Sequence, residues 1–220
     1  MPTHATRPNF RKLTGFLHAG ALTVVMTAIL AGCGAQTIVS ETAKAAFEDR
    51  LAEEQVVDAK IKAGIIGRIT DIDKSLILDV SIDVWKNRVM MTGALSDSGT
   101  RNSVIRAAQQ DSRISDFYNN IHIVSPQQQS ERREWMDKAK SGGQTVSNVV
   151  SDVWIETKIS AQLISEDGVT SVNYRWRSVL GDVYIIGEAS SSSELNRVLK
   201  IISDTKGVKS VKSHVLLSSH

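Results

Sequence analysis

The chain has 220 residues, of which 41% are hydrophobic, enough for one or two small domains with cores of their own. Its formal net charge of +2 comes from the leader: Arg7, Arg11 and Lys12 precede Cys33 without any acid, so the rest carries 26 − 3 = 23 basic and 24 acidic residues. That balance, without a basic block, gives no indication of nucleic-acid binding.

Residues 1–32 have the three parts of a secretory signal peptide. Basic residues come first, an apolar run from Leu13 to Leu30 follows, and the small residues Ala31 and Gly32 precede Cys33. An uncleaved membrane helix is the alternative, although glycine and histidine residues interrupt the run. The tetrapeptide L-A-G-C resembles the bacterial lipobox. The resemblance implies that Cys33 is lipidated, palmitate being among the expected acyl chains, and becomes residue one of the mature protein.

The identity of Gly34 bears on which membrane holds this anchor. In enterobacteria an aspartate at this position tends to retain a lipoprotein at the inner membrane, and glycine stands here instead. We therefore expect an outer-membrane protein, lipid-anchored and facing the periplasm. Because Cys33 is the only cysteine, the mature chain has none left for a disulfide, a thiol nucleophile or a cysteine metal site.

A long helix is predicted from Ser40 to about Ile66, since the segment is rich in helix formers and contains no proline. Its first half, Glu41–Arg50, is expected to be a solvated spacer. The second half begins a domain that continues with the hairpin Leu78–Gly93, a helix over about Thr100–Gln110 and a closing strand over Phe117–Val124. The inward residues of these two helices are predicted to be Ile61, Ile65, Val104, Ile105 and Ala108.

The segment Ser125–Thr145 reads as a linker, because it opens with Pro126 and a glutamine run and ends in two glycines. Its charged middle is expected to form a short helix that presents Trp135 and Met136 together. Docking of the linker onto a neighbouring domain is the ordinary role of such a pair, and a partner site is the alternative.

The second half of the chain repeats the first at an offset of 94 residues. The hairpin Val172–Gly187 echoes Leu78–Gly93, with Gly187 in the place of Gly93 and Gly181-Asp182 in the place of Asn87-Arg88. Helices are predicted over about Asp152–Ile164 and Ser192–Asp204, and a last strand over Val211–Leu217. Their inward residues are predicted to be Ile155, Ile159, Leu163, Leu195, Leu199 and Ile202. A single unit has therefore been duplicated.

These elements predict an α+β protein made of two tandem αββαβ domains, each a three-stranded sheet covered on one face by two helices. The expected boundaries are 1–32 for the signal peptide, 33–53 for the lipidated N-terminus and helical spacer, 54–124 for the first copy, 125–147 for the linker and 148–220 for the second copy.

The D-x-x-I motifs at Asp58 and Asp152, the paired hairpins closed by glycine and G-V-x-x-V at Gly207 resemble the BON-domain family. Lipidated outer-membrane members with two copies are the most similar in layout. Arg113-Ile114 departs from the family's Gly-Val, and the linker is longer than expected.

The resemblance implies binding to membrane phospholipid, with anionic headgroups favoured, through the first helix of the second copy. If Ile155, Ile159 and Leu163 face the sheet, the opposite side carries the site residues Trp154, Lys158, Ala161 and Ile164. A tryptophan beside a lysine suits the boundary between headgroups and acyl chains. The first copy has Lys60 and Gly64 at the places of Trp154 and Lys158. The alternative is that Trp154 packs against the first copy or the linker.

Three further side chains are assigned to the strand faces that point away from the helices. Arg175 and Arg177 are interpreted as ordinary surface charges in preference to a phosphate site. Trp85, on the same side of the first sheet, is predicted to be exposed and to mark a docking surface between the domains.

No catalytic residue, cofactor or metal site is predicted. The mature chain has three histidines, His122, His214 and His220, and its carboxylates are scattered, whereas a metal site needs convergent ligands. The sequence leaves two non-enzymatic functions open. One is a phospholipid-binding lipoprotein that supports outer-membrane integrity; the other is a lipid-anchored adaptor that docks a periplasmic or outer-membrane protein and recognises no headgroup.

Overall fold

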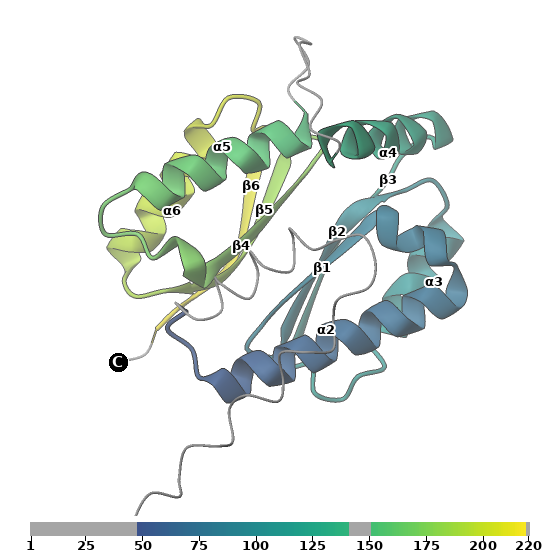
Figure 1. Cartoon of the computed structure of the whole chain (residues 1–220), viewed down its shortest axis with the longest axis horizontal. Coiled ribbons are helices and arrows are strands. Elements are labelled where there is room, and N and C mark those ends of the chain that lie inside the picture. The colour runs from purple at the N-terminus through teal and green to yellow at the C-terminus, as the bar shows by residue number, and fades with distance from the viewer. Residues whose placement is uncertain (1–47, 141–150, 219–220) are drawn as a thin grey trace, which may run out of the picture. The chain divides into compact units, whose positions relative to one another are not determined.

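The structure, a computed structural model, describes residues 48–140 and 151–218. The first copy forms a three-stranded sheet in which β1 and β2 are antiparallel and β2 and β3 are parallel. Helices α2 and α3 lie on one face of that sheet (Figure 1). The elements are α2 (Ala52–Ile72), the 3-10 helix η1 (Lys74–Leu78), β1 (Val80–Trp85), β2 (Arg88–Leu95), α3 (Ser98–Ala108) and β3 (Asp116–Ile123).

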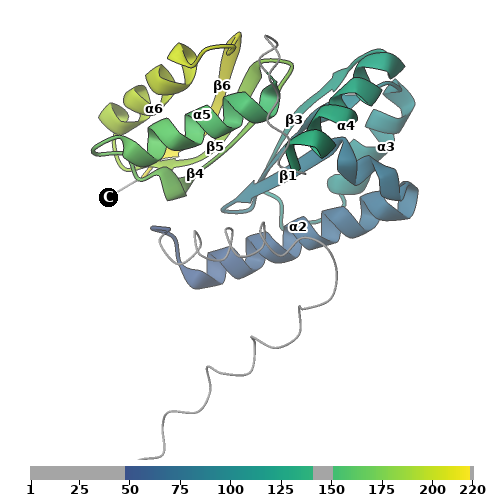
Figure 2. The same cartoon turned by 45° about the horizontal axis from the view of Figure 1, so that its top comes forward.

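The second copy has the same architecture, with α5 and α6 on one face of a sheet ordered β4-β5-β6 (Figure 2). Adding 94 to the bounds of β1, β2 and β3 gives the bounds of β4, β5 and β6, and Val80 pairs with Gly93 as Tyr174 pairs with Gly187. The predicted α+β fold of two αββαβ units is confirmed. The elements are α5 (Asp152–Ser165), η2 (Ser171–Asn173), β4 (Tyr174–Val179), β5 (Asp182–Ala189), α6 (Ser192–Asp204) and β6 (Ser210–Leu217).

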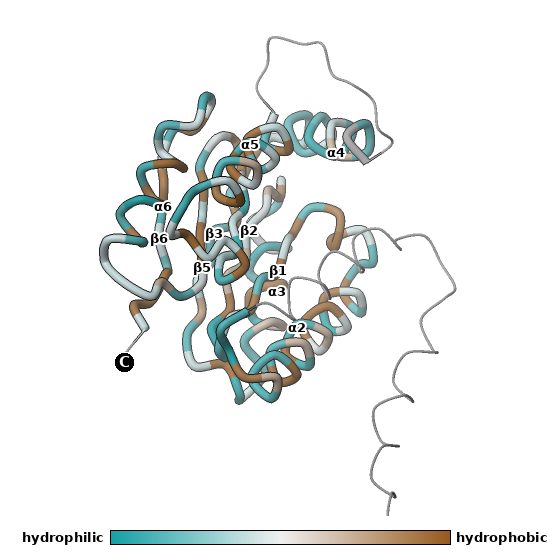
Figure 3. Tube along the Cα trace, turned by 60° about the vertical axis from the view of Figure 1, so that its left-hand side comes forward, coloured by the Kyte–Doolittle hydropathy of each residue, from teal (hydrophilic) through white to brown (hydrophobic). Residues whose placement is uncertain are grey.

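Each copy has its own core between the sheet and the two helices, and Figure 3 shows hydrophobic and hydrophilic residues alternating along α2 and α5. All five core residues predicted on these two helices are buried. The second helix of each copy, α3 or α6, buries a slightly different side from the one predicted. In α3, Val104 and Ala108 are buried while Ile105 is half-buried, and in α6 Val198 is buried beside Ile202 while Leu195 and Leu199 pack at the core's edge.

The aspartate of each D-x-x-I motif holds the turn of its own hairpin. Asp58 accepts hydrogen bonds from the backbone N–H groups of Lys86 and Asn87, both 2.8 Å long. These two residues have positive φ angles of 48° and 63°, which point their N–H groups the same way, toward the helix. Asp152 binds the turn of the second hairpin in the same manner. The motif therefore ties the first helix of each copy to its hairpin.

The predicted helical spacer is wrong at its C-terminal end. Residues 48–51 are not helical, α2 begins at Ala52, and the earlier part of the spacer lies outside the described residues. Glu48 is buried and accepts hydrogen bonds from Arg50 and from Arg175 of the second copy, while the N–H of Asp49 donates to Asn173 Oδ1 at 3.1 Å. A charged and a polar partner in the second copy therefore hold a segment whose composition suggested solvation.

The linker contains a longer helix than predicted, α4 (Pro126–Lys140). Proline suits the first position of a helix, where no N–H is needed. Arg133 donates to both carboxylate oxygens of Asp79, and Gln129 donates to the same carboxylate at 2.6 Å and accepts from the Ser96 N–H at 2.9 Å. These contacts fix α4 to the first copy.

The sheet faces that point away from the helices pack against each other, so the two arginines assigned to solvent are not surface charges. Arg177 makes two hydrogen bonds, of 2.8 and 2.9 Å, to the buried carboxylate of Asp83, and Arg175 binds Glu48. Trp85 lies between the copies as predicted, but it is 1% exposed, and Arg50 stacks on its ring at 4.3 Å. The apolar contact comprises Trp85, Met90 and Ala94 of the first copy and Val179, Tyr184 and Ile186 of the second.

A histidine in this contact makes stability depend on pH. His214 stacks on Tyr118 with 3.9 Å between ring centroids, and its Nε2 lies 3.4 Å from Asn120 Nδ2. Burial, together with the positive charges of Lys212 and Arg88, lowers the pKa of His214 from 6.5 to about 4. Between these two pH values the unfolded chain binds more protons than the folded chain, so stability falls as the pH falls.

We expect this proton uptake to cost about 1–2 kcal/mol between pH 7.5 and pH 4.5, after allowance for the partial exposure of the ring. Urea denaturation at the two pH values measures the loss. The matched variant is His214→Asn, because asparagine occupies the equivalent position 120 of the first copy. The variant should lose less stability on acidification than the parent; an equal loss would contradict the assignment to His214.

Candidate functional site: the exposed face of helix α5

The sequence around α5 defines both where the helix starts and which side it buries. Ser151 caps the helix, its Oγ accepting a hydrogen bond of 3.2 Å from the Trp154 N–H. Ile155, Ile159 and Leu163 follow at four-residue intervals and are buried in the second core. Because 3.6 residues make one turn, residues about half a turn away from this stripe face outward.

The four residues predicted to contact phospholipid all lie on the exposed part of α5. Trp154 is 38% exposed and Ile164 is 67% exposed, and Lys158 and Ala161 are exposed as well. The Lys158 ammonium lies 5.5 Å from the centroid of the Trp154 ring, within the range of a cation–π contact. Trp154, Lys158 and Ala161, at i, i+4 and i+7, form one stripe, and Ile164 extends the apolar surface toward the end of the helix.

The equivalent face of the first copy differs in chemistry. Lys60 is exposed at the position that matches Trp154, and Gly64 stands where Lys158 stands. Within the described residues, α2 therefore has no exposed aromatic ring at this point of its surface. The two copies share a fold but not this surface.

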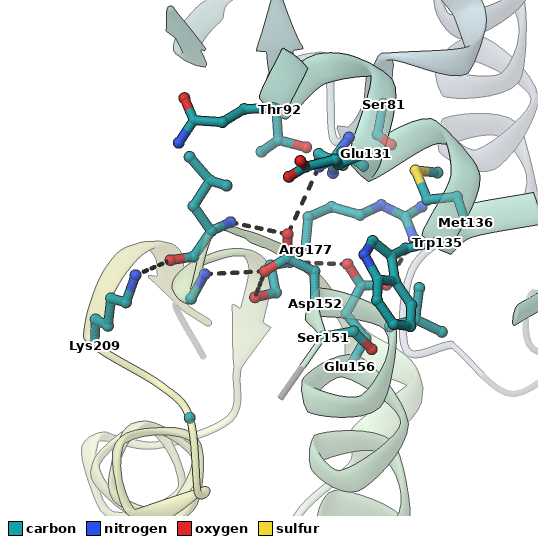
Figure 4. Close-up of a pocket in the computed structure, with 17 residues that line it drawn as sticks. Ser81, Thr92, Glu131, Trp135, Met136, Ser151, Asp152, Glu156, Arg177 and Lys209 are labelled. Atoms are coloured by element: carbon teal, nitrogen blue, oxygen red, sulfur yellow. Dashed lines mark hydrogen bonds and ion pairs between the residues drawn. The ribbon is translucent and has the colours of Figure 1, made fainter. Parts of the chain in front are cut away.

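A pocket of about 360 Å³ lies at the N-terminal end of α5, between α4, the first sheet and the second hairpin (Figure 4). Trp135 and Met136, the pair noticed in the linker sequence, are half-buried on its α4 side. Glu156 of α5 lies opposite, and burial raises the pKa of its carboxyl group although Arg177 nearby opposes the rise. The sequence pointed to the tryptophan and methionine, but nothing in it indicated that a turn of α5 would complete the pocket.

Three polar groups around the pocket have partners within the protein. Arg132 Nε lies 3.6 Å from Asp152 Oδ2, the Lys209 ammonium donates to the Leu180 carbonyl at 2.7 Å, and the Ser178 N–H donates to Glu156 Oε1 at 2.8 Å. A charged ligand would have to displace one of these partners. Beside these groups, the Trp135 ring gives the pocket an apolar wall.

Two properties of the described ranges bear on function. None of their helices combines the length and the apolar composition that a membrane crossing requires. Within the same ranges, no three histidine, cysteine, aspartate or glutamate side chains converge to form a metal site. The predicted lipidation site, Cys33, lies outside the described residues.

Comparisons with known proteins agree with the geometry of the second copy. Residues 151–218 match the BON domain family. An uncharacterized protein in the gshII 5′ region of Anaplasma centrale is 33% identical over 138 residues, which are 63% of this chain and 81% of that protein. Osmotically-inducible protein Y of Escherichia coli K12 is 22% identical over 161 residues, 73% of this chain and 71% of that protein.

Among solved structures, CdsD, a structural protein of the type III secretion system of Chlamydia trachomatis, aligns with a TM-score of 0.31 and 10% identity over 71% of this chain and 91% of that one. The match at residues 151–218, the equivalent architecture of residues 52–123 and the similarity to osmotically-inducible protein Y agree on one identification. The chain belongs to the BON-domain family.

Proposed function

We propose that this protein is a non-enzymatic envelope lipoprotein that binds anionic phospholipid membranes through α5 of its second copy and supports outer-membrane integrity. Lipidation of Cys33 would anchor it in the outer membrane, facing the periplasm. The BON family is associated with membrane and phospholipid binding and with envelope proteins, which supports the general assignment. The anionic preference, the site residues and the outer-membrane location are the specific parts of the proposal.

The observation that carries the proposal is the exposed Trp154 ring with the Lys158 ammonium 5.5 Å from its centroid. An indole ring is favoured at the level of the headgroups, because its apolar body can enter the acyl region while its N–H stays hydrated. A lysine at that depth gains about 1 kcal/mol from an anionic surface. Ile164 adds apolar area on the same helix, so α5 offers both kinds of attraction.

Each of these contributions to the free energy of membrane binding is small. The lipid anchor lowers the affinity that α5 itself must supply. A free domain with one tryptophan, one lysine and one isoleucine at the surface binds a vesicle weakly. A domain tethered to the membrane meets it at a high effective concentration, so the same contacts suffice to orient α5 and to favour one lipid composition. We therefore assign anchoring to Cys33 and lipid selection to α5.

The test is flotation of residues 34–220, which lack the anchor, with vesicles of anionic or neutral phospholipid. We expect binding to anionic vesicles alone, a fall of about tenfold for Trp154→Ala and about fivefold for Lys158→Ala, and weaker binding as salt rises. The matched control is Trp135→Ala, a half-buried tryptophan that also has a lysine near its ring, with Lys138 at 5.4 Å. It should float like the parent; equal losses for both tryptophans would refute the site.

The pocket beside Trp135 and Met136 supports the second candidate, a lipid-anchored adaptor for another envelope protein. An apolar side chain of a partner would fit a pocket of about 360 Å³ with an indole wall. The outer sheet faces are not open to such a partner, because the two copies cover each other there. Failure of both vesicle types to float the protein, together with crosslinking through Trp135 and Met136 positions, would favour the adaptor.

A further inference from the structure

The contact between the two copies joins residues that occupy the same position in each repeat. Asp83 and Arg177 are 94 residues apart, the offset of the duplication, and form a bidentate ion pair. Asn120 and His214 are also 94 apart and meet at 3.4 Å. Contact between equivalent residues occurs where a two-fold axis passes between two identical subunits.

The pairing of strands across the contact has the reciprocity that such an axis demands. Strand β1 contacts β5 and strand β2 contacts β4, and these two pairs exchange under the 94-residue offset. The shared apolar cluster takes three residues from each copy, and two of the three correspond under the offset, Trp85 with Val179 and Met90 with Tyr184. In a two-fold interface, if residue i of one subunit contacts residue j of the other, then j also contacts i. The copies are therefore packed like the subunits of a homodimer, within one chain.

The symmetry is broken at the ion pair. Asp83 is 2% exposed, so its charge needs a partner, and Arg177 supplies it. If two first copies met through this face, Asp83 would meet another Asp83. If two second copies met, Arg177 would meet another Arg177. A buried like-charge pair is strongly unfavourable, so the same face accepts the other copy and rejects itself.

We propose that the outer sheet face of each copy is a module-pairing surface whose partner is another BON copy, and that Asp83 and Arg177 select pairing of a first copy with a second. The linker keeps the partner of the same chain at high effective concentration, so the chain pairs its own copies. Pairing between chains would need the same Asp83–Arg177 match. This inference does not depend on lipid binding by α5.

A single thiol reports whether the face is covered. In residues 34–220 the variant Ala94→Cys carries the only cysteine, at a contact position that is 1% exposed. Its reaction rate with a thiol reagent measures opening of the contact. The control thiol is Ala108→Cys, buried in the core of the first copy and outside the contact between copies. It reports whether the first copy itself remains folded.

Charge reversal then tests the selection. In the Ala94→Cys background, Arg177→Asp should raise labelling about tenfold, because two buried carboxylates then face each other. Adding Asp83→Arg restores an opposite-charge pair and should return labelling to within about threefold of the parent. Arg197→Asp is the matched control, since Arg197 belongs to the second copy but has its ion-pair partner, Glu166, in that copy. It should change labelling little.

The labelling rates distinguish support for the proposal from its refutation. The proposal is supported if labelling rises with Arg177→Asp and falls again with the double reversal, while the thiol of Ala108→Cys stays protected. Labelling that does not rise, or a double reversal as reactive as the single variant, overturns it. Arg177→Asp could also expose the thiol of Ala108→Cys. The double reversal then remains the test, because renewed protection of both thiols requires that the charges at positions 83 and 177 act on each other.

Discussion

Gly187→Ala is expected to prevent folding of the second copy, with a loss of more than about 4 kcal/mol in the free energy of unfolding. The φ angle of Gly187 is 155°, which side chains with a β-carbon rarely adopt. A β-carbon there would lie 2.2 Å from the backbone oxygen of Asn173 and 3.0 Å from the Cα of Tyr174. Both neighbours are backbone atoms, so neither can move aside without breaking the pairing of β4 with β5.

Circular dichroism and thermal unfolding measure the effect. The equivalent Gly93→Ala should unfold the first copy, because its β-carbon would meet the Asp79 oxygen at the same 2.2 Å. Gly67→Ala is the control: it lies inside α2 with no atom within 4 Å of the added carbon, and we expect a gain of about 0.5–1 kcal/mol. A Gly187→Ala protein with the parental unfolding temperature would show that the closing glycines are not required.

Asp152→Ala is expected to destabilise the second copy by about 3 kcal/mol. The carboxylate accepts hydrogen bonds from the N–H groups of Leu180 and Gly181, at 2.8 and 2.9 Å, and from the Ser178 hydroxyl at 2.7 Å. Leu180 has a φ of 57°, an uncommon angle for a leucine, and the carboxylate helps to hold the turn in that conformation. Alanine leaves two backbone donors without a partner.

Chemical denaturation of the variant and of Asp152→Asn tests this role. Asparagine keeps one acceptor oxygen, so its loss should lie between those of the parent and the alanine variant. Asp204→Ala is the control, since its carboxylate is exposed on α6 and pairs with the exposed Lys200, an arrangement worth less than about 1 kcal/mol. Equal losses for Asp152→Ala and Asp204→Ala would mean that the turn does not depend on the motif.

The repeated pattern made the fold predictable. Each element appears twice, so an element predicted in one copy is supported by the equivalent pattern in the other. The 94-residue offset aligned the hairpins, and hydrophobic spacing identified the buried faces of α2 and α5. Spacing was less informative for α3 and α6, which lie at the edges of their cores. There Ile105 and Leu199 are only half-buried, because a small rotation of the helix exchanges them with their neighbours.

The partners of charged residues were not predictable from local sequence. Arg177 alternates with apolar residues along β4, a pattern typical of a strand with one solvated side. Its neighbour Asp83 is 94 residues away, and only the packing of one sheet on the other brings the carboxylate into reach. The same holds for Glu48, whose composition-based assignment to a solvated spacer fails because Arg175 binds it.

The prediction of the candidate lipid site depended on the periodicity of α5 and on the family resemblance. Periodicity assigned Trp154 and Lys158 to the side of α5 opposite the core, and the structure places the two side chains together on that exposed side. Their role as lipid contacts comes from the family resemblance and remains the proposal. The pocket formed with Trp135 could not be foreseen, because its walls come from α4, α5 and the first sheet.

The most direct test of the membrane assignment is quenching of Trp154 by lipids with brominated acyl chains. Tryptophan emission of residues 34–220 is recorded with anionic vesicles that carry or lack the bromine atoms, and the Trp154→Phe variant gives the background of the other three tryptophans. With vesicles in large excess, which offsets the weak binding of the unanchored chain, our account predicts quenching in the parent and almost none in Trp154→Phe, because α5 alone inserts an indole ring. Equal quenching in both proteins, or none in either, would contradict it.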